Sequence, residues 1–95
     1  MPFSVPPSDT AGVREFHASS RFLAQLDAAP PRVQKAVRKQ LDLLRTQGLR
    51  YPSLGAEKHD PARKIWWLRA TLDWRFYLQD TGDTFLLLSL FPHPK

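Results

Sequence analysis

The sequence contains no cysteine and no long apolar run. Without cysteine the chain has no disulfide framework, no thiolate zinc site and no cysteine nucleophile. The longest apolar stretch, residues 85–91, is interrupted by Ser89 and is far too short to span a bilayer. The first ten residues lack the basic and apolar segments of a secretory signal. These absences favour a soluble protein of the cytoplasm, with no membrane partner.

What the chain does have is positive charge. Its 95 residues are enough for one domain, and 42% of them are hydrophobic, which is ordinary for a protein with a packed core. The formal net charge is +5, with 14 Lys and Arg against 9 Asp and Glu. Such an excess favours a polyanionic partner, nucleic acid first and an anionic membrane surface second. A basic domain with no acidic partner remains an alternative at this point.

Prolines divide the chain into an arm and a domain. Residues 1–12 include Pro2, Pro6 and Pro7, which predicts an irregular N-terminal arm ahead of a domain covering residues 13–95. Residues 13–17 predict a first strand. Ser19 and Ser20 are suitable N-caps for a helix that ends before Pro30. Residues 31–47 form a clear amphipathic helix with glycine at the expected stop, so we expect an αα-hairpin.

The second half of the sequence predicts strands. Residues 49–64 contain proline and glycine without a stable period, which indicates a loop with one short strand. Residues 65–71, 74–79 and 84–91 are rich in aromatic and branched side chains and are separated by short turns. Consecutive strands of this kind form an antiparallel meander. The fold class is therefore α+β, with a two-helix hairpin packed on one face of the sheet.

Alternation along the strands separates a buried face from an open one. The side chains predicted to lie under the helices are Trp66, Leu68, Trp74, Phe76 and Leu78. The opposite face is then expected to carry Arg69, Arg75 and Tyr77, with Trp67 nearby. Guanidinium groups suit phosphate binding because they present a planar fork of donors. The alternative is an ordinary solvated face, with these groups paired to Asp73 or Gln79.

Other polar groups are less specific. The second predicted helix carries cations on its outer faces, and either a solvated surface or contact with RNA explains them: Arg32, Lys35, Arg38 and Lys39. His17, His59 and His93 are far apart in sequence and lack metal-site spacing, so neither a metal nor a cofactor is expected. We interpret His59 and Asp60 as part of a solvated turn.

Several short strings resemble the carboxy-terminal signature of the RelE/ParE toxins, which belong to type II toxin–antitoxin systems. They are residues 67–70 (WLRA), 73–77 (DWRFY), 82–84 (GDT) and 92–95 (PHPK), preceded by residues 51–54 (YPSL) and 57–58 (EK). The resemblance implies a β-α-α-β-β-β order. It also places the first strand beside the last one, in a four- to five-stranded, mainly antiparallel sheet.

The resemblance also implies an activity. RelE-like toxins are metal-independent endoribonucleases that cut mRNA, generally on the ribosome, and so inhibit translation until an antitoxin binds them. By position, Arg69 and Arg75 resemble the phosphate-stabilising arginines and His93 the proton-transfer residue. Lys58 matches a basic position, Tyr77 is placed to orient or stack on a base, and Trp67 to bind RNA. Glu57 matches a base found in some branches.

Two alternatives accompany this interpretation. The ParE branch shares the fold, inhibits DNA gyrase and lacks the catalytic set, so a non-enzymatic inhibitor is one alternative. A degenerate member that folds and only binds is the other. The presence of Arg69, Arg75 and His93 in this sequence favours RNA cleavage.

Overall fold

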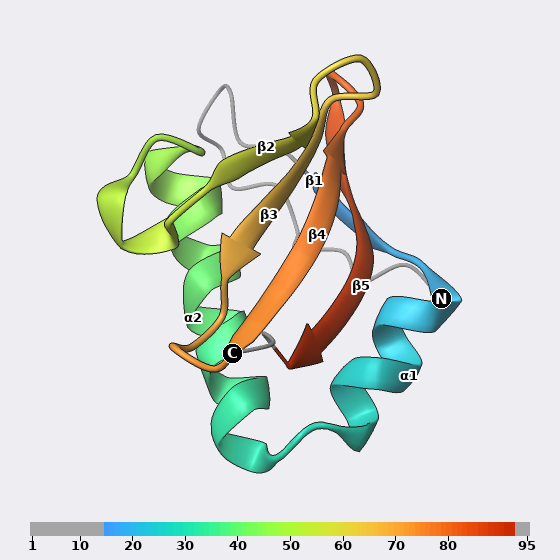
Figure 1. The fold of residues 1–95 in the computed structure, drawn as a ribbon, viewed down its shortest axis with the longest axis vertical. Helices are drawn as coiled ribbons and strands as arrows, with labels where there is room; N and C mark the ends of the chain where they lie inside the picture. Colours follow the sequence, from blue (N-terminus) through green and yellow to red (C-terminus); the bar gives the residue numbers. More distant parts are fainter. Residues whose placement is uncertain (1–14, 93–95) are drawn as a thin grey trace.

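The computed structural model describes residues 15–92. The predicted N-terminal arm and His93 lie outside these residues. Two helices, a short 3-10 helix and five strands follow one another along the chain (Figure 1). Their bounds are β1 Glu15–Ala18, α1 Ser20–Ala28, α2 Pro31–Gln47, η1 Pro52–Leu54, β2 Glu57–Asp60, β3 Ile65–Arg69, β4 Trp74–Asp80 and β5 Thr84–Pro92.

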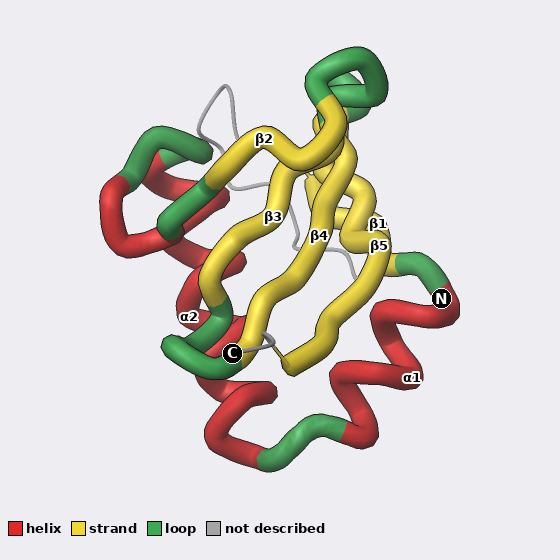
Figure 2. The backbone as a smooth tube through the Cα atoms, in the orientation of Figure 1, coloured by secondary structure: helices red, strands yellow, loops and turns green. Residues whose placement is uncertain are grey.

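The five strands form one sheet in the order β1-β5-β4-β3-β2. Strands β2 to β5 are antiparallel neighbours, whereas β1 runs parallel to β5 at the edge of the sheet. The two helices cover one face of the sheet, and the other face is open (Figures 1 and 2). The predicted α+β class, the helix hairpin and the first strand beside the last are confirmed.

Local chemistry sets the bounds of the helices. The Ser19 hydroxyl accepts a hydrogen bond from the Phe22 amide at 3.0 Å, which caps the first turn of α1. Pro31 occupies the first turn of α2, where a missing N–H costs nothing. Gly48 ends α2 with a φ of 83°, a conformation that side chains with a Cβ rarely adopt. Both helix predictions are therefore confirmed for the reasons that the sequence suggested.

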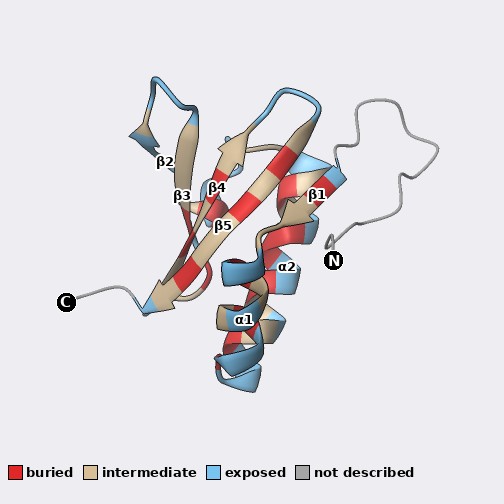
Figure 3. Cartoon of the chain, turned by 90° about the vertical axis from the view of Figure 1, so that its right-hand side faces the viewer, coloured by how far each residue is buried: buried red, intermediate tan, exposed pale blue. Residues whose placement is uncertain are grey.

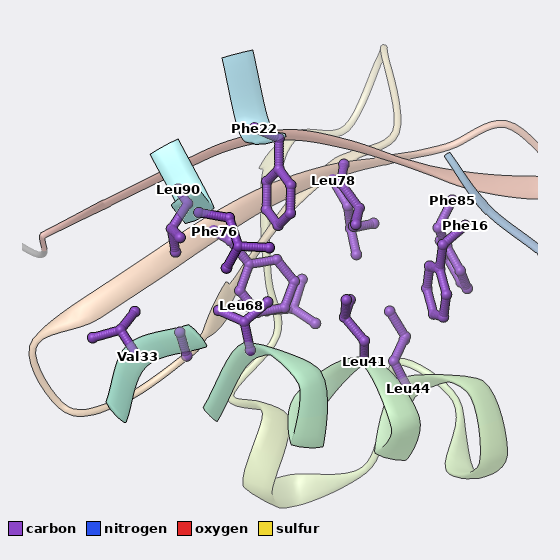
Figure 4. Packing of buried hydrophobic residues seen from close by; sticks show 14 of the residues in the cluster. Phe16, Phe22, Val33, Leu41, Leu44, Leu68, Phe76, Leu78, Phe85 and Leu90 are labelled. Carbon is purple, nitrogen blue, oxygen red and sulfur yellow. The ribbon is translucent and has the colours of Figure 1, made fainter. Parts of the chain in front are cut away.

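The core lies between α2 and the covered face of the sheet (Figure 4). Val33, Val37 and Leu41 lie along one side of α2 and are at most 2% exposed. Val33 and Leu41 face the side of the sheet that carries Leu68, Phe76 and Leu78, which are fully buried (Figure 4). The ring of Phe22 meets that of Phe76 edge-on, with centroids 6.4 Å apart. Packing of this kind fixes which face of β3 and β4 is turned outward.

Helix α1 lies beside the half of β5 that β1 leaves unpaired. Strand β1 pairs only with residues 84–87 of β5. Beyond them the Ser19 hydroxyl donates to the Leu88 carbonyl at 2.8 Å, and the Leu90 amide donates to Gln25 Oε1 at 2.7 Å. These bonds satisfy an edge that would otherwise be exposed to water or to another strand.

One buried amide connects three elements. Gln40 of α2 is 7% exposed, and its Nε2 donates to the Arg69 carbonyl at 2.7 Å and the Ser53 carbonyl at 3.0 Å. A buried amide of this kind is costly unless both carbonyls are present. Gln40 therefore fixes the end of β3 against η1 and α2, and with it the backbone from which Arg69 projects.

Candidate functional site

The open face of the sheet is the surface opposite the helices, and it carries the polar and aromatic side chains predicted for it. Trp67, Tyr77 and Ser89 lie side by side on β3, β4 and β5, and Arg69, Arg75 and Phe91 form the next row. Trp67, Arg75 and Tyr77 are partly buried, and Arg69 is exposed. Alternating burial along β5 is visible from the side (Figure 3). The predicted division of faces in β3 and β4 is confirmed.

Tyr77 is the centre of an aromatic cluster on this face. Its ring centroid lies 4.7 Å from that of His59, 5.0 Å from Phe91 and 6.4 Å from Trp67. The His59 and Tyr77 rings are nearly parallel, at 24°, and so they are stacked. Each such contact contributes roughly 0.5–1.5 kcal/mol beyond simple burial. The cluster gives the open face a floor of aromatic rings, of which His59 is exposed and the others are partly buried.

His59 lies on the open face because it stands two residues after Glu57 in β2, and alternate residues of a strand share a face. Lys58 pairs with Trp66 and Asp60 pairs with Ile65, which leaves His59 as the extra residue between them. This bulge turns Asp60 to the face of Ile65, whereas plain alternation would place it on the face of Lys58. The interpretation of His59 as a turn residue was wrong, because it belongs to β2 and its ring stacks on Tyr77, but its side chain is exposed as expected. No periodicity in this short polar segment indicates the bulge.

Glu57 supplies a carboxylate to the same face. Its Oε2 accepts a hydrogen bond from Trp67 Nε1 at 2.9 Å, and Glu57 and Trp67 are paired across β2 and β3. The Glu57 side chain is exposed. An exposed carboxylate held by a neutral donor can still accept a proton. Glu57 therefore joins the arginines on the open face as a candidate base.

Arg75 is fixed by the turn that joins β3 to β4. Its Nη1 donates to the carbonyls of Thr71 at 2.8 Å, Trp74 at 3.1 Å and Leu72 at 3.3 Å. The guanidinium carbon also lies 5.9 Å from the centre of the Trp67 ring. Nε and Nη2 make no hydrogen bond to any of the described residues. Arg75 is thus a pre-ordered cation with donors left over.

Arg69 stands across the strand pair from Arg75, with which it is in direct register. Its side chain packs along Gly55, where a Cβ would come within 3.5 Å of Arg69 Cβ, Nε and Cζ. Among residues 15–92 no carboxylate pairs with either arginine. Like charges opposite each other on a sheet repel. An anion between the two guanidinium groups would remove that repulsion, so the pair is suited to phosphate.

The arginine pair leads to a prediction about stability. Arg75→Ala removes the donor that bridges three turn carbonyls, and we expect the free energy of unfolding to fall by about 1–3 kcal/mol. Arg69→Ala should change it by less than about 0.5 kcal/mol because Arg69 is exposed and without a partner among the described residues. Urea denaturation of both variants measures this difference. Equal stability of the two variants would show that Arg75 does not hold the turn.

Lys58 is not brought together with the arginines. Its ammonium lies 5.6 Å from the centre of the Trp66 ring, on the face of the sheet opposite to Trp67. It borders a separate hollow with Lys64 and Asp80. Adjacent residues of a strand point to opposite faces, so Glu57 and Lys58 cannot both face the arginines. Lys58 was predicted from a basic position of the family, and that prediction did not consider which face of the sheet its side chain would occupy.

The remaining predicted residues lie elsewhere. The cations of α2 are exposed on a helix that packs behind the sheet, away from the open face (Figure 1): Arg32, Lys35, Arg38 and Lys39. His93 lies outside the described residues, immediately after the end of β5 at Pro92.

Within residues 15–92, no three His, Asp or Glu side chains gather as metal ligands would. None of the described helices is long and apolar enough to cross a membrane.

Comparison with known proteins rests on structure alone, because no family model and no curated protein matches the sequence. The toxin–antitoxin complex DinJ–YafQ of E. coli matches with a TM-score of 0.71 and 13% identity, over 85% of this chain and 93% of that one. This chain has the RelE/ParE toxin fold. The RelB–RelE complex of Methanococcus jannaschii matches with a TM-score of 0.67 and 13% identity, over 79% and 87% of the two chains. The YoeB–YefM complex of Staphylococcus aureus gives 0.68 and 12%, over 85% and 98%.

Proposed function

We propose that this RelE/ParE-fold protein is the toxin of a toxin–antitoxin system and an endoribonuclease that cuts translated mRNA. The observation that carries the proposal is the register of Arg69 and Arg75 on the open face, beside an aromatic floor and a carboxylate. Single-stranded RNA offers phosphates for the arginines and bases that stack on aromatic rings. Messenger RNA and ribosomes are cytoplasmic in location, and we infer the same for this protein.

The proposed reaction is an intramolecular displacement. The 2′-oxygen of one nucleotide forms a bond to the adjacent phosphorus, and the bond from phosphorus to the 5′-oxygen of the next nucleotide breaks. The products are a 2′,3′-cyclic phosphate and a 5′-hydroxyl. A base must take the 2′-OH proton, and an acid must protonate the leaving oxygen. The nucleophile belongs to the substrate, so positioning and charge stabilisation supply most of the rate increase.

We assign a role in this reaction to each residue from its position in the structure. Glu57 is the candidate base, because it is exposed on the open face and fixed by Trp67. Arg69 and Arg75 stabilise the charge that develops on the phosphoryl oxygens. We keep His93 as the proposed acid, since it follows β5 directly and imidazole exchanges protons near neutral pH. Tyr77 and His59 provide stacking surface, and Lys58 has no direct role in this arrangement.

The proposed partners of this protein follow from the positive charges on α2 and on the open face. The exposed cations of α2 are proposed to contact ribosomal RNA while the open face holds the message. An antitoxin with an acidic segment would neutralise the open face by covering the two arginines. The toxin–antitoxin complexes DinJ–YafQ and RelB–RelE, and the YoeB–YefM complex, support a protein partner for this chain as well.

Two reactions run side by side test this function. Purified protein is added to a cell-free translation reaction, in which 5′ ends of the message are mapped by primer extension, and to a gyrase supercoiling reaction. We expect discrete cuts in the message and unimpaired supercoiling. Blocked supercoiling with an intact message would support the gyrase inhibitor instead. Neither effect, from protein that also leaves growth unchanged on induction, would indicate a binding module.

A further inference from the structure

A hollow of about 490 Å³ lies between the start of α1 and the open face. Its floor is the stacked pair His59 and Tyr77, and its walls are Ile65, Leu88 and Ser89. Arg21 of α1 stands at its margin. The size falls within the range of about 300–1,000 Å³ that is usual for small-molecule sites. The candidate base and the two arginines of the cleavage chemistry do not line this hollow.

A second bulge creates the hollow. Tyr77 pairs with Ser89, but Leu78 pairs with Leu87, so Leu88 is an extra residue in β5. The neighbours Leu87 and Leu90 are buried, whereas Leu88 and Ser89 are both partly exposed and both line the hollow. A regular strand would send one of these two side chains into the core. The bulge thus gives the hollow one apolar and one polar wall.

The polar atoms of the hollow are available for a ligand. The Tyr77 and Ser89 hydroxyls and the His59 ring nitrogens make no hydrogen bond to any residue from 15 to 92. The Ser19 hydroxyl, by contrast, already donates to Leu88 and accepts from Phe22. Three groups that can both donate and accept therefore surround an aromatic floor. This combination suits a planar heterocycle with mixed donors and acceptors at its edge.

Arg21 adds a positive charge at the margin of the hollow, which favours a ligand with a negative group. Its side chain is exposed, and within the described range it has no carboxylate partner. No acidic residue occurs in the first turn of α1. The row of Arg69 and Arg75 lies two residues further along the strands, which is roughly 7 Å away. A ligand that enters the hollow from the arginine row therefore meets a cation at each end and a stacking surface between them.

We propose that the hollow binds one nucleotide of the RNA, the one next to the cleaved bond, with its base on the stacked pair of His59 and Tyr77 and its outer phosphate on Arg21. This proposal builds on the proposed function, because the inner phosphate is the one held by Arg69 and Arg75. Base stacking on an aromatic ring contributes about 1–3 kcal/mol in single-strand binding. The free hydroxyl and imidazole groups contact the edge of the base and select among bases.

The test uses nucleoside 5′-monophosphates and the matching uncharged nucleosides as probes of the full chain. In ¹H–¹³C NMR spectra of the aromatic side chains, the chemical shifts of His59 and Tyr77 should change as a monophosphate is added and should reach saturation. Arg21→Ala should weaken monophosphate binding roughly fivefold to tenfold and leave nucleoside binding unchanged. Arg50→Ala removes the same charge from an exposed loop and should alter neither.

The results separate this site from the proposed function. Shifts confined to other residues, or an equal loss of nucleoside and monophosphate binding in Arg21→Ala, would overturn the nucleotide site even if mRNA is cut. Probe binding at His59 and Tyr77 with an intact message would support the site and refute the endoribonuclease. Shifts at both rings together with the selective effect of Arg21→Ala support the proposal.

Discussion

Arg69→Ala is expected to lower the rate of mRNA cleavage about 100- to 1,000-fold while the protein stays folded. The reason is electrostatic, because we propose that this guanidinium stabilises the charge that develops on the phosphoryl oxygens. Removal of one donor to a developing oxyanion typically costs a factor of that size. Arg69 makes no contact on which the core depends, and it is exposed. The rate is measured from the accumulation of primer-extension products in a translation reaction.

Arg50→Ala is the matched control. It removes one positive charge from an exposed loop outside the sheet, and we expect cleavage within about twofold of the unmodified protein. A comparable loss in both variants would mean that net charge alone attracts the RNA. Full activity of Arg69→Ala would contradict the role of the arginine pair.

Phe76→Ala is expected to lower the free energy of unfolding by about 3–5 kcal/mol, the usual cost of deleting a buried phenylalanine. Phe76 is fully buried under α2 and contacts the ring of Phe22. Small domains are stable by only about 5–15 kcal/mol, so the variant would be near the limit of folding. Urea denaturation followed by circular dichroism measures the change.

Phe91→Ala provides the comparison with the open face. The same atoms are removed, but Phe91 is partly exposed and its ring packs on that of Tyr77. We expect a loss of about 1–2 kcal/mol, well below that of Phe76→Ala. A larger loss in Phe91→Ala would mean that the open face, and not the helix-covered face, contains the main core.

Regular periodicity made most of the fold predictable. The stripe of Val33, Val37 and Leu41 identified α2, and Pro31 and Gly48 marked its bounds. Strict alternation in β4 was enough to place Phe76 on the face opposite to Arg75, since successive side chains of a regular strand point to opposite sides. The first predicted strand, residues 13–17, overlaps β1, and the placement of β1 beside β5 followed from family resemblance alone. Hydrophobic pattern and turn chemistry were sufficient wherever the strands are regular.

Irregular backbone explains the failures. Bulges at His59 and Leu88 shift the alternation of β2 and β5 by one residue, and a sequence pattern of period two cannot show them. The segment 57–60 (EKHD) has no branched residue, so its pairing with β3 is a tertiary effect. The predicted strand 65–71 was two residues too long, because Ala70 and Thr71 bond Trp74 within the turn.

The candidate site was predictable in part for the same reasons. Arg69, Arg75, Tyr77 and Trp67 lie on regular stretches of β3 and β4, so their shared face was predicted correctly. Lys58 was assigned by family position, without regard to the face on which β2 places it. The restraint of Arg75 by three turn carbonyls, and the stacking of His59 on Tyr77, depend on side-chain geometry that no sequence spacing encodes.

The most direct test of the central claim uses a message with one altered sugar. After the cut positions have been mapped, a message is prepared with a single 2′-deoxynucleotide on the 5′ side of one cut. If the open face promotes attack by the 2′-oxygen, that cut disappears while cuts elsewhere in the same message persist at their original rates. Continued cutting at the deoxynucleotide would contradict the proposed reaction, because the nucleophile would then have to come from elsewhere.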